Sequence, residues 1–158
     1  VGASVPSEYG DYYAWGEIET KSEYRKKTSL TYGVELGDIS GNPRYDAATA
    51  NWGEGWRLPT KQELDELADK CVWTITTYDD VDGYKVTGPN GNSIFLPAAG
   101  LRYESSLNYV GEYGCYWSTT PYEGDSQFAY YLNFNSGSYD VGWFYRYYGR
   151  SVRPVSDK

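Results

Sequence analysis

The chain has 158 residues, enough for one domain with a hydrophobic core, and its net charge is −8. Its one basic cluster (Lys21, Arg25, Lys26 and Lys27) is interleaved with glutamates, which makes nucleic acid a poor partner. No apolar run approaches the length of a membrane span, so membrane insertion is not expected. The absence of histidine excludes Ser–His and Cys–His catalysis and histidine-based metal sites.

The first half of the chain predicts one firm helix among irregular segments. Residues 1–19 are expected to be an extended opening, residues 20–43 a turn-rich excursion with at most one short strand, and residues 45–51 a short helix. A capping box then begins at Thr60, whose hydroxyl and the Glu63 carboxylate can each accept from the other's backbone N–H. One apolar stripe follows at helical spacing: Leu64, Leu67, Ala68 and Cys71. This helix is expected to pack on a sheet.

Beyond the helix the apolar period changes to two, which is typical of strands. Strands are predicted at 73–78, 84–87, 93–96, 116–119 and 128–135 and onward to Val155, with a loop at 101–114. The prediction is an α+β fold, with one or two helices packed on antiparallel strands and long loops. We expect a single domain over residues 1–158. Because Met is absent and Val1 opens on a strand-like run, we also expect a piece of a longer or processed precursor.

The C-terminal segment is unusually aromatic. Residues 116–148 hold 13 of the 29 aromatic side chains, and Tyr and Trp suit both cores and binding surfaces. Alternation directs Tyr130, Leu132 and Phe134 toward the core, with Trp117 and Val152 as their expected neighbours. The run 139–150 has too many rings for one buried face, so about half are expected to face a partner.

Several motifs resemble a known family. The run Trp56–Leu64 is similar to a segment of formylglycine-generating-enzyme and sulfatase-modifying-factor domains; here Trp56 and Leu58 are expected to alternate into the core. Five separated runs resemble the Fibrobacter succinogenes major paralogous domain, which is abundant in Bacteroidetes surface and secreted proteins: Tyr9–Glu17, Gly83–Gly91, Ile94–Gly100, Tyr116–Ser118 and Ser151–Val155. The resemblance implies a C-type-lectin-like fold and an extracellular or cell-surface location.

The same architecture resembles the variable proteins of diversity-generating retroelements, whose variable segments lie at the C-terminal end. The residues that suit such a ligand-binding segment are Tyr122, Asp125, Tyr131, Asn133, Ser138, Tyr139, Asp140, Trp143, Phe144, Tyr145, Tyr147 and Tyr148. The resemblance implies a non-catalytic binding or adhesion module for an extracellular protein or glycan, on a bacterial surface or phage particle. The alternative is a structural subunit of a surface appendage, with these rings buried between protomers.

Other candidate chemistry is weaker. The acidic run 79–82 with Glu123 or Asp125 has oxygens that calcium prefers, but a solvated turn is the better interpretation, and no cofactor is expected. The active-site cysteine pair of the oxidase relatives and the iron-binding histidines of the ergothioneine-synthesis relatives are missing. A hydrolase with two carboxylates stays open as a minor alternative.

Two further pairs of residues allow two interpretations each. Cys71 and Cys115 lie 44 positions apart, and two buried free thiols are favoured over a disulfide. Arg57 and Arg153 are predicted to pair with buried carboxylates or carbonyls and hold the terminal strand, with an anionic ligand as the alternative. The closing run Ser151–Val155 is expected to complete the fold and to lie outside the site.

Overall fold

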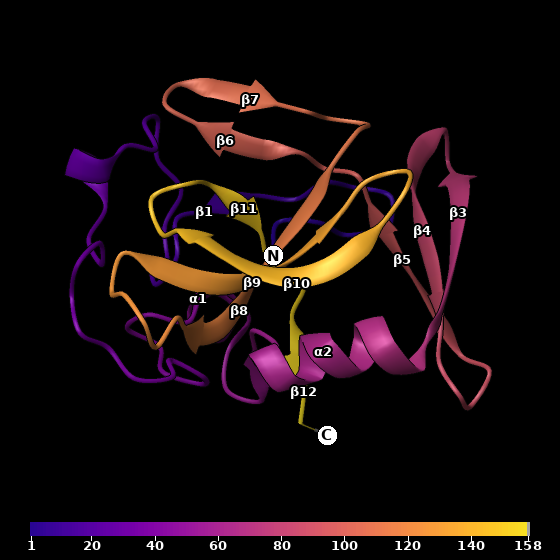
Figure 1. Cartoon of the computed structure of the whole chain (residues 1–158), viewed down its shortest axis with the longest axis horizontal. Coiled ribbons are helices and arrows are strands. Elements are labelled where there is room, and N and C mark those ends of the chain that lie inside the picture. Colours follow the sequence, from indigo (N-terminus) through magenta and orange to yellow (C-terminus); the bar gives the residue numbers. More distant parts are fainter. Residues whose placement is uncertain (158) are drawn as a thin grey trace.

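The computed structural model, which describes residues 1–157, is built around a five-stranded sheet (Figure 1). Its strands follow in the order β1 (Tyr12–Tyr13), β11 (Arg150–Ser151), β8 (Gly114–Pro121), β9 (Phe128–Phe134) and β10 (Tyr139–Tyr145). Only β11 and β8 pair in parallel; the other neighbours are antiparallel. Segments from both ends of the chain therefore meet in this sheet, and β10 forms one of its edges.

Helix α2 (Lys61–Lys70) covers one face of this sheet, as predicted. Its capping box is complete: the Thr60 hydroxyl accepts from the Glu63 N–H at 3.1 Å, and the Glu63 carboxylate accepts from the Thr60 N–H at 2.9 Å. Leu64 is buried against Leu132 and Phe134 of β9. The apolar stripe thus packs on the inward side chains of the strand.

A second, three-stranded antiparallel sheet stands beside the helix, at the right of Figure 1. It comprises β3 (Val72–Tyr78), β4 (Val81–Thr87) and β5 (Ser93–Pro97). Buried Tyr84, Val86 and Leu96 join the same core as α2 and β9. Strands β3 and β5 are both edges of this sheet.

The remaining elements are short. They are the 3-10 helix η1 (Lys26–Thr28), α1 (Ala47–Trp52), β2 (Trp56–Arg57) paired with β12 (Val155–Ser156), and the hairpin β6 (Leu101–Tyr103) and β7 (Ser106–Asn108). The prediction of a loop over 101–114 was therefore wrong. Strands of three residues are too short to display a period of two, and bridges to Tyr24 and Gly149 hold this hairpin in place.

Two core clusters lie on opposite faces of the main sheet. Tyr130, Leu132 and Phe134 are buried as predicted, because these alternate side chains of β9 share one face. Trp117 and Val152 are also buried, but in the other cluster. Their predicted position beside Tyr130, Leu132 and Phe134 was therefore wrong: in β8 it is Tyr116 that faces α2, and Trp117 points the other way.

The short segment before α2 also corrects the sequence analysis. Leu58 is buried as expected, but Trp56 is 36% exposed and packs edge-on against Trp52, with ring centroids 5.0 Å apart. The two-residue strand β2 pairs only with the terminal strand β12 at the surface. Alternation placed Trp56 on the inner side, but its ring packs instead on the exposed Trp52 at the end of α1.

Arg57 and Arg153 pair with carboxylates and carbonyls near the chain termini, as predicted, but these partners lie at the surface and are not buried. The Arg57 guanidinium pairs with Glu63 at 2.5 Å and with Asp157 at 3.0 Å. Hydrogen bonds from Arg57 lower the pKa of Glu63 to about 2. Arg153 donates to the carbonyl oxygens of Pro6 at 2.9 Å and Glu8 at 3.3 Å.

The cysteines are both free thiols. Cys71 ends α2 and is half-buried, while Cys115 is buried and its pKa is raised by burial. Within residues 1–157, no three acidic or cysteine side chains gather as a set of metal ligands. No helix of the described chain has the length and hydropathy to cross a membrane.

Candidate functional site

Most of the predicted C-terminal rings join a single set of packed side chains, here called the aromatic array. Neighbouring ring centroids in the array lie between 4.5 and 6.4 Å apart. Its members are Tyr32, Tyr103, Tyr122, Phe128, Tyr130, Trp143, Phe144, Tyr145, Tyr147 and Tyr148. Rings held in mutual contact lose little further freedom when a ligand binds, so the array is preorganised.

Strand β10 divides the array between the two faces of the sheet. Trp143 pairs with Tyr130 and Phe144 with Ala129, so these two neighbouring side chains point to opposite faces. Trp143 is 49% exposed and stacks on Tyr122, with centroids 4.5 Å apart and planes 7° apart. Phe144, on the other face, contacts Tyr148 at 5.0 Å. The expectation of one outward set was therefore too simple.

The two sides of the array meet beyond the end of β10. Tyr145 contacts both Phe144 at 5.1 Å and Tyr147 at 5.3 Å. Tyr148 stacks on Tyr103 of the β6–β7 hairpin at 4.9 Å, and Tyr147 packs against Tyr32 at 5.6 Å. Burial raises the pKa of Tyr147 to about 12, so its phenol stays protonated at neutral pH.

Tyr32 and Tyr103 were missed by sequence reasoning. Tyr32 lies in the predicted turn-rich excursion and Tyr103 in the predicted loop, and each reaches the array through tertiary packing. Tyr32 also donates from its hydroxyl to Gln127 at 2.9 Å, beside Phe128. Their tyrosine-rich context was the one available signal, and it did not distinguish them from the other tyrosines of the chain.

The basic cluster of the sequence borders the array. Arg25, Lys26 and Lys27 line a hollow of about 590 Å³ together with Tyr32, Tyr103, Tyr147 and Glu104. Lys26 lies over the Tyr32 ring, with its ammonium 5.2 Å from the centroid. Arg25 is neutralised by Glu23 and Glu104, whereas Lys26 and Lys27 form no ion pair within residues 1–157. One end of the array is thus positive in an acidic protein.

A buried cation lies beneath the second face of the array. Arg150 is 1% exposed, and its guanidinium carbon lies 3.9 Å from the Tyr131 centroid, 5.4 Å from Tyr148 and 5.7 Å from Phe144. The Arg150 Nε has no hydrogen-bond partner within residues 1–157. Its contacts with the rings therefore hold Phe144 and Tyr148 from below.

The other predicted site residues lie outside the array. Tyr131 is half-buried between Trp117 and Arg150, so it supports the site from the core side. Tyr139 stacks on Trp73 at 4.3 Å, at the opposite end of β10. The remaining predicted residues serve turns or sit on β9 and β10 apart from the rings: Asp125, Asn133, Ser138 and Asp140.

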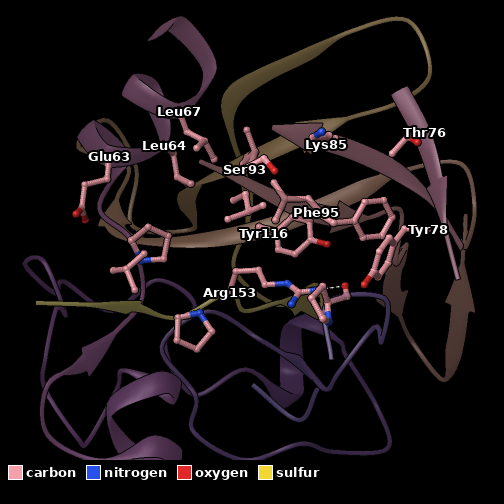
Figure 2. A pocket seen from close by; sticks show the side chains of 17 residues that line it. Glu63, Leu64, Leu67, Thr76, Tyr78, Lys85, Ser93, Phe95, Tyr116 and Arg153 are labelled. Carbon is pink, nitrogen blue, oxygen red and sulfur yellow. Dashed lines mark hydrogen bonds between the residues drawn. The ribbon is translucent and has the colours of Figure 1, made fainter. Parts of the chain in front are cut away.

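A groove of about 750 Å³ opens between α2, the three-stranded sheet and the terminal strand (Figure 2). Figure 2 shows Leu64 and Leu67 of α2 on one side, Ser93 and Phe95 of β5 on the other, and Tyr116 between them. No residue of this groove belongs to the aromatic array. Sequence reasoning did not find it, because its walls come from elements that the sequence predicts only as core packing.

The arrangement of the array suits noncovalent recognition. It offers flat ring faces for stacking and phenol hydroxyls for hydrogen bonds. The acidic residues considered as calcium ligands do not converge on one point: Asp82 accepts from the Thr77 hydroxyl of the three-stranded sheet, whereas Glu123 accepts from the Tyr130 hydroxyl of the array. The chemistry available at the array is therefore stacking, hydrogen bonding and attraction of negative charge at its basic end.

Fold and site together define a strand-rich α+β domain that carries an aromatic surface on its main sheet. The chain belongs to the Lcl C-terminal domain family, which matches residues 46–156. That family is linked to C-type-lectin-like variable-protein domains. The matched range includes both α-helices and every member of the array except Tyr32. Comparison with curated proteins gives no match, and comparison with solved structures gives none either.

Proposed function

We propose that this domain is a non-catalytic ligand-binding module, and that the aromatic array is its binding surface. The observation that carries the proposal is the continuity of the array: rings from four separate segments form one connected set that passes around the end of β10 from one face of the sheet to the other. Trp143 and Phe144, one on each face, stay 49% and 36% exposed. Exposed rings have an unfavourable contact with water, so a clustered set of them favours a partner. The ligand is an extracellular protein or a glycan.

Family membership supports the same proposal. The Lcl C-terminal domain family is linked to variable-protein domains of the C-type-lectin-like kind, and the predicted variable segment supplies six of the array's rings. We therefore propose a C-type-lectin-like fold, relationship to the Fibrobacter succinogenes major paralogous domain, and an extracellular or cell-surface location. Diversification by a retroelement, on a bacterial surface or phage particle, belongs to the same proposal.

A ligand screen with two matched tryptophan variants tests this function. Trp143→Ser removes an exposed ring of the array, while Trp52→Ser removes a ring of similar exposure (41%) outside it. The chain is screened against a glycan array and a panel of extracellular proteins. For a ligand so found, Trp143→Ser should weaken binding about tenfold or more, and Trp52→Ser should leave it unchanged.

Folding controls separate a binding surface from a core. Because Trp143 is half-exposed, Trp143→Ser should lower the free energy of unfolding by only about 1 kcal/mol. A loss above about 3 kcal/mol would place this ring in the core and contradict the proposal. Self-association that disappears in Trp143→Ser, with no other ligand, would instead favour a structural subunit.

A further inference from the structure

We propose that the groove between α2 and β5 is a second binding site, which takes an extended peptide segment as an additional strand on β5. This site is separate from the aromatic array and needs no part of it. Its occupant is defined by the main chain of β5 and by the side chains across the groove.

The groove runs along the free edge of β5. In the three-stranded sheet β5 pairs only with β4, so no strand within residues 1–157 pairs with its other side. Four consecutive β5 residues, from Ser93 to Leu96, line the groove. Consecutive residues of a strand point to opposite faces, so a groove that contacts all of them passes around the edge of the strand. Thr76, Tyr78 and Lys85 also line the groove, so beyond this edge it extends over one face of the sheet.

The hydrogen-bond pattern leaves main-chain groups of β5 free on that edge. At one end of the β4–β5 pair the Gly88 N–H donates to the Asn92 carbonyl at 2.9 Å, and at the other end the Ala98 N–H donates to the Asp82 carbonyl at 2.8 Å. These two bonds fix which residues of β5 are hydrogen-bonded to β4, because such residues alternate along an antiparallel pair. The even-numbered residues of β5 therefore bond to β4, and the odd-numbered residues turn their N–H and C=O groups away from it. These residues are Ser93 and Phe95, whose outward groups have no hydrogen-bond partner within residues 1–157.

The end of the edge is closed. Pro97 has no N–H to donate, and its carbonyl oxygen already accepts from the Tyr116 hydroxyl at 2.6 Å. Two residues, Ser93 and Phe95, therefore offer four free main-chain groups. An added segment of about five residues can use all four.

The walls indicate which side chains such a peptide carries. Leu64 and Leu67 face β5 across the groove. Glu63 is held by Arg57 and Arg153 by backbone carbonyls, whereas Lys85 forms no ion pair within residues 1–157. The matching peptide has apolar side chains at alternate positions and one carboxylate near Lys85.

Other occupants leave the edge unsatisfied. A helix has already paired its own main-chain groups, and a small apolar molecule has none, so neither would bond to Ser93 and Phe95. Unpaired strand edges are the usual site at which an extended chain joins a sheet. An extended peptide therefore matches both the apolar walls and the polar edge.

Titration of the whole chain with defined peptides tests the site. The probes are capped seven-residue peptides with valine at alternate positions, threonine between them and aspartate at one of the threonine positions. By amide NMR, binding should shift the Ser93 and Phe95 resonances downfield and slow their hydrogen exchange about tenfold or more. N-methylation of the peptide N–H groups that face β5 should weaken binding about tenfold, and methylation of the opposite N–H groups should not.

Two variants at one position provide a protein-side control. Ser93→Pro removes an outward N–H that β4 does not use, at the first residue of an edge strand, so the sheet should form. It should weaken peptide binding about tenfold, whereas Ser93→Thr, which keeps the N–H, should not. Trp143→Ser should leave peptide binding unchanged.

Four results would overturn the proposal. The first is equal binding of the two methylated isomers of the peptide. The second is peptide binding that leaves the Ser93 and Phe95 amide resonances unchanged. The third is the absence of binding by any of the probe peptides at about millimolar concentration. The fourth is protection of these amides that depends on protein concentration without peptide, because it would assign the edge to a second copy of the chain.

Discussion

Two buried arginines in this domain are expected to respond very differently to the same substitution. Arg146 donates three hydrogen bonds to carbonyl oxygens: its Nη1 donates to those of Thr31 and Val34, each at 2.8 Å, and its Nε donates to that of Phe128 at 3.0 Å. Its guanidinium also lies 4.4 Å from the Trp15 ring centroid. It joins the 20–43 segment to the first residue of β9.

The expected cost of Arg146→Met follows from these contacts. Three carbonyl oxygens lose a charged donor at about 1.5 kcal/mol each, and the cation–ring contact adds about 1 kcal/mol. Removal of the buried charge offsets about 1.5 kcal/mol of this loss, which leaves a total near 4 kcal/mol. Arg150→Met loses only a weak side-chain hydrogen bond to the Cys115 thiol, and the loss of its ring contacts with Tyr131 and Trp117 is offset by removal of a buried charge that has no carboxylate partner within residues 1–157. Its net effect should stay within about 1 kcal/mol.

Urea unfolding of the two variants and the parent, followed by tryptophan fluorescence at pH 7, measures the difference. The dependence of the free energy on urea should be the same in all three, so that midpoints compare directly. Arg146→Met should be less stable than Arg150→Met by about 3 kcal/mol. We infer that hydrogen bonds, and not ring contacts, decide how much a buried guanidinium stabilises this fold. Equal losses of unfolding free energy in the two variants, or a larger loss for Arg150→Met, would refute this.

Two further predictions concern buried or paired carboxylates. Because Arg57 lowers the folded-state pKa of Glu63 to about 2, this pair stabilises the fold above the unfolded pKa near 4.5 and loses its effect as pH falls toward 2. The urea midpoint of Glu63→Gln should therefore fall less steeply over this pH range than that of the parent. Parallel plots of urea midpoint against pH would contradict this. Asp46 is wholly buried and accepts from four backbone N–H groups, so Asp46→Ala should lower the free energy of unfolding in urea by more than about 3 kcal/mol. The control Asp65→Ala breaks a surface ion pair with Lys61 and should cost under about 1 kcal/mol. Similar losses in the two variants would show that Asp46 does not anchor its loop.

Local signals in the sequence predicted the helix and most strands correctly. The capping box at Thr60 and the stripe from Leu64 place α2 to within a residue, because both signals act within one helical turn. Alternation around Leu132 likewise identified the buried face of β9. Such features depend on neighbours in the chain, which the sequence displays directly.

Features that depend on distant segments were missed or misplaced. The β6–β7 hairpin has strands too short for a visible period, and Trp56 packs on the exposed Trp52 instead of on its predicted inner side. Tyr32 and Tyr103 entered the array only because their loops fold back onto the C-terminal turn. The groove beside β5 likewise requires knowing that α2 and the terminal strand stand opposite a free edge.

The sequence by itself determined that this protein would be a strand-rich α+β domain with more C-terminal rings than a core can hold. The tertiary structure alone decided how those rings are divided. Side chains alternate along β10, so Trp143 and Phe144 must point to opposite faces of the sheet. How exposed each ring is depends on which other segments pack on its face. Arg150 and Tyr103 cover one face and Tyr122 the other, and these contacts join residues far apart in the chain.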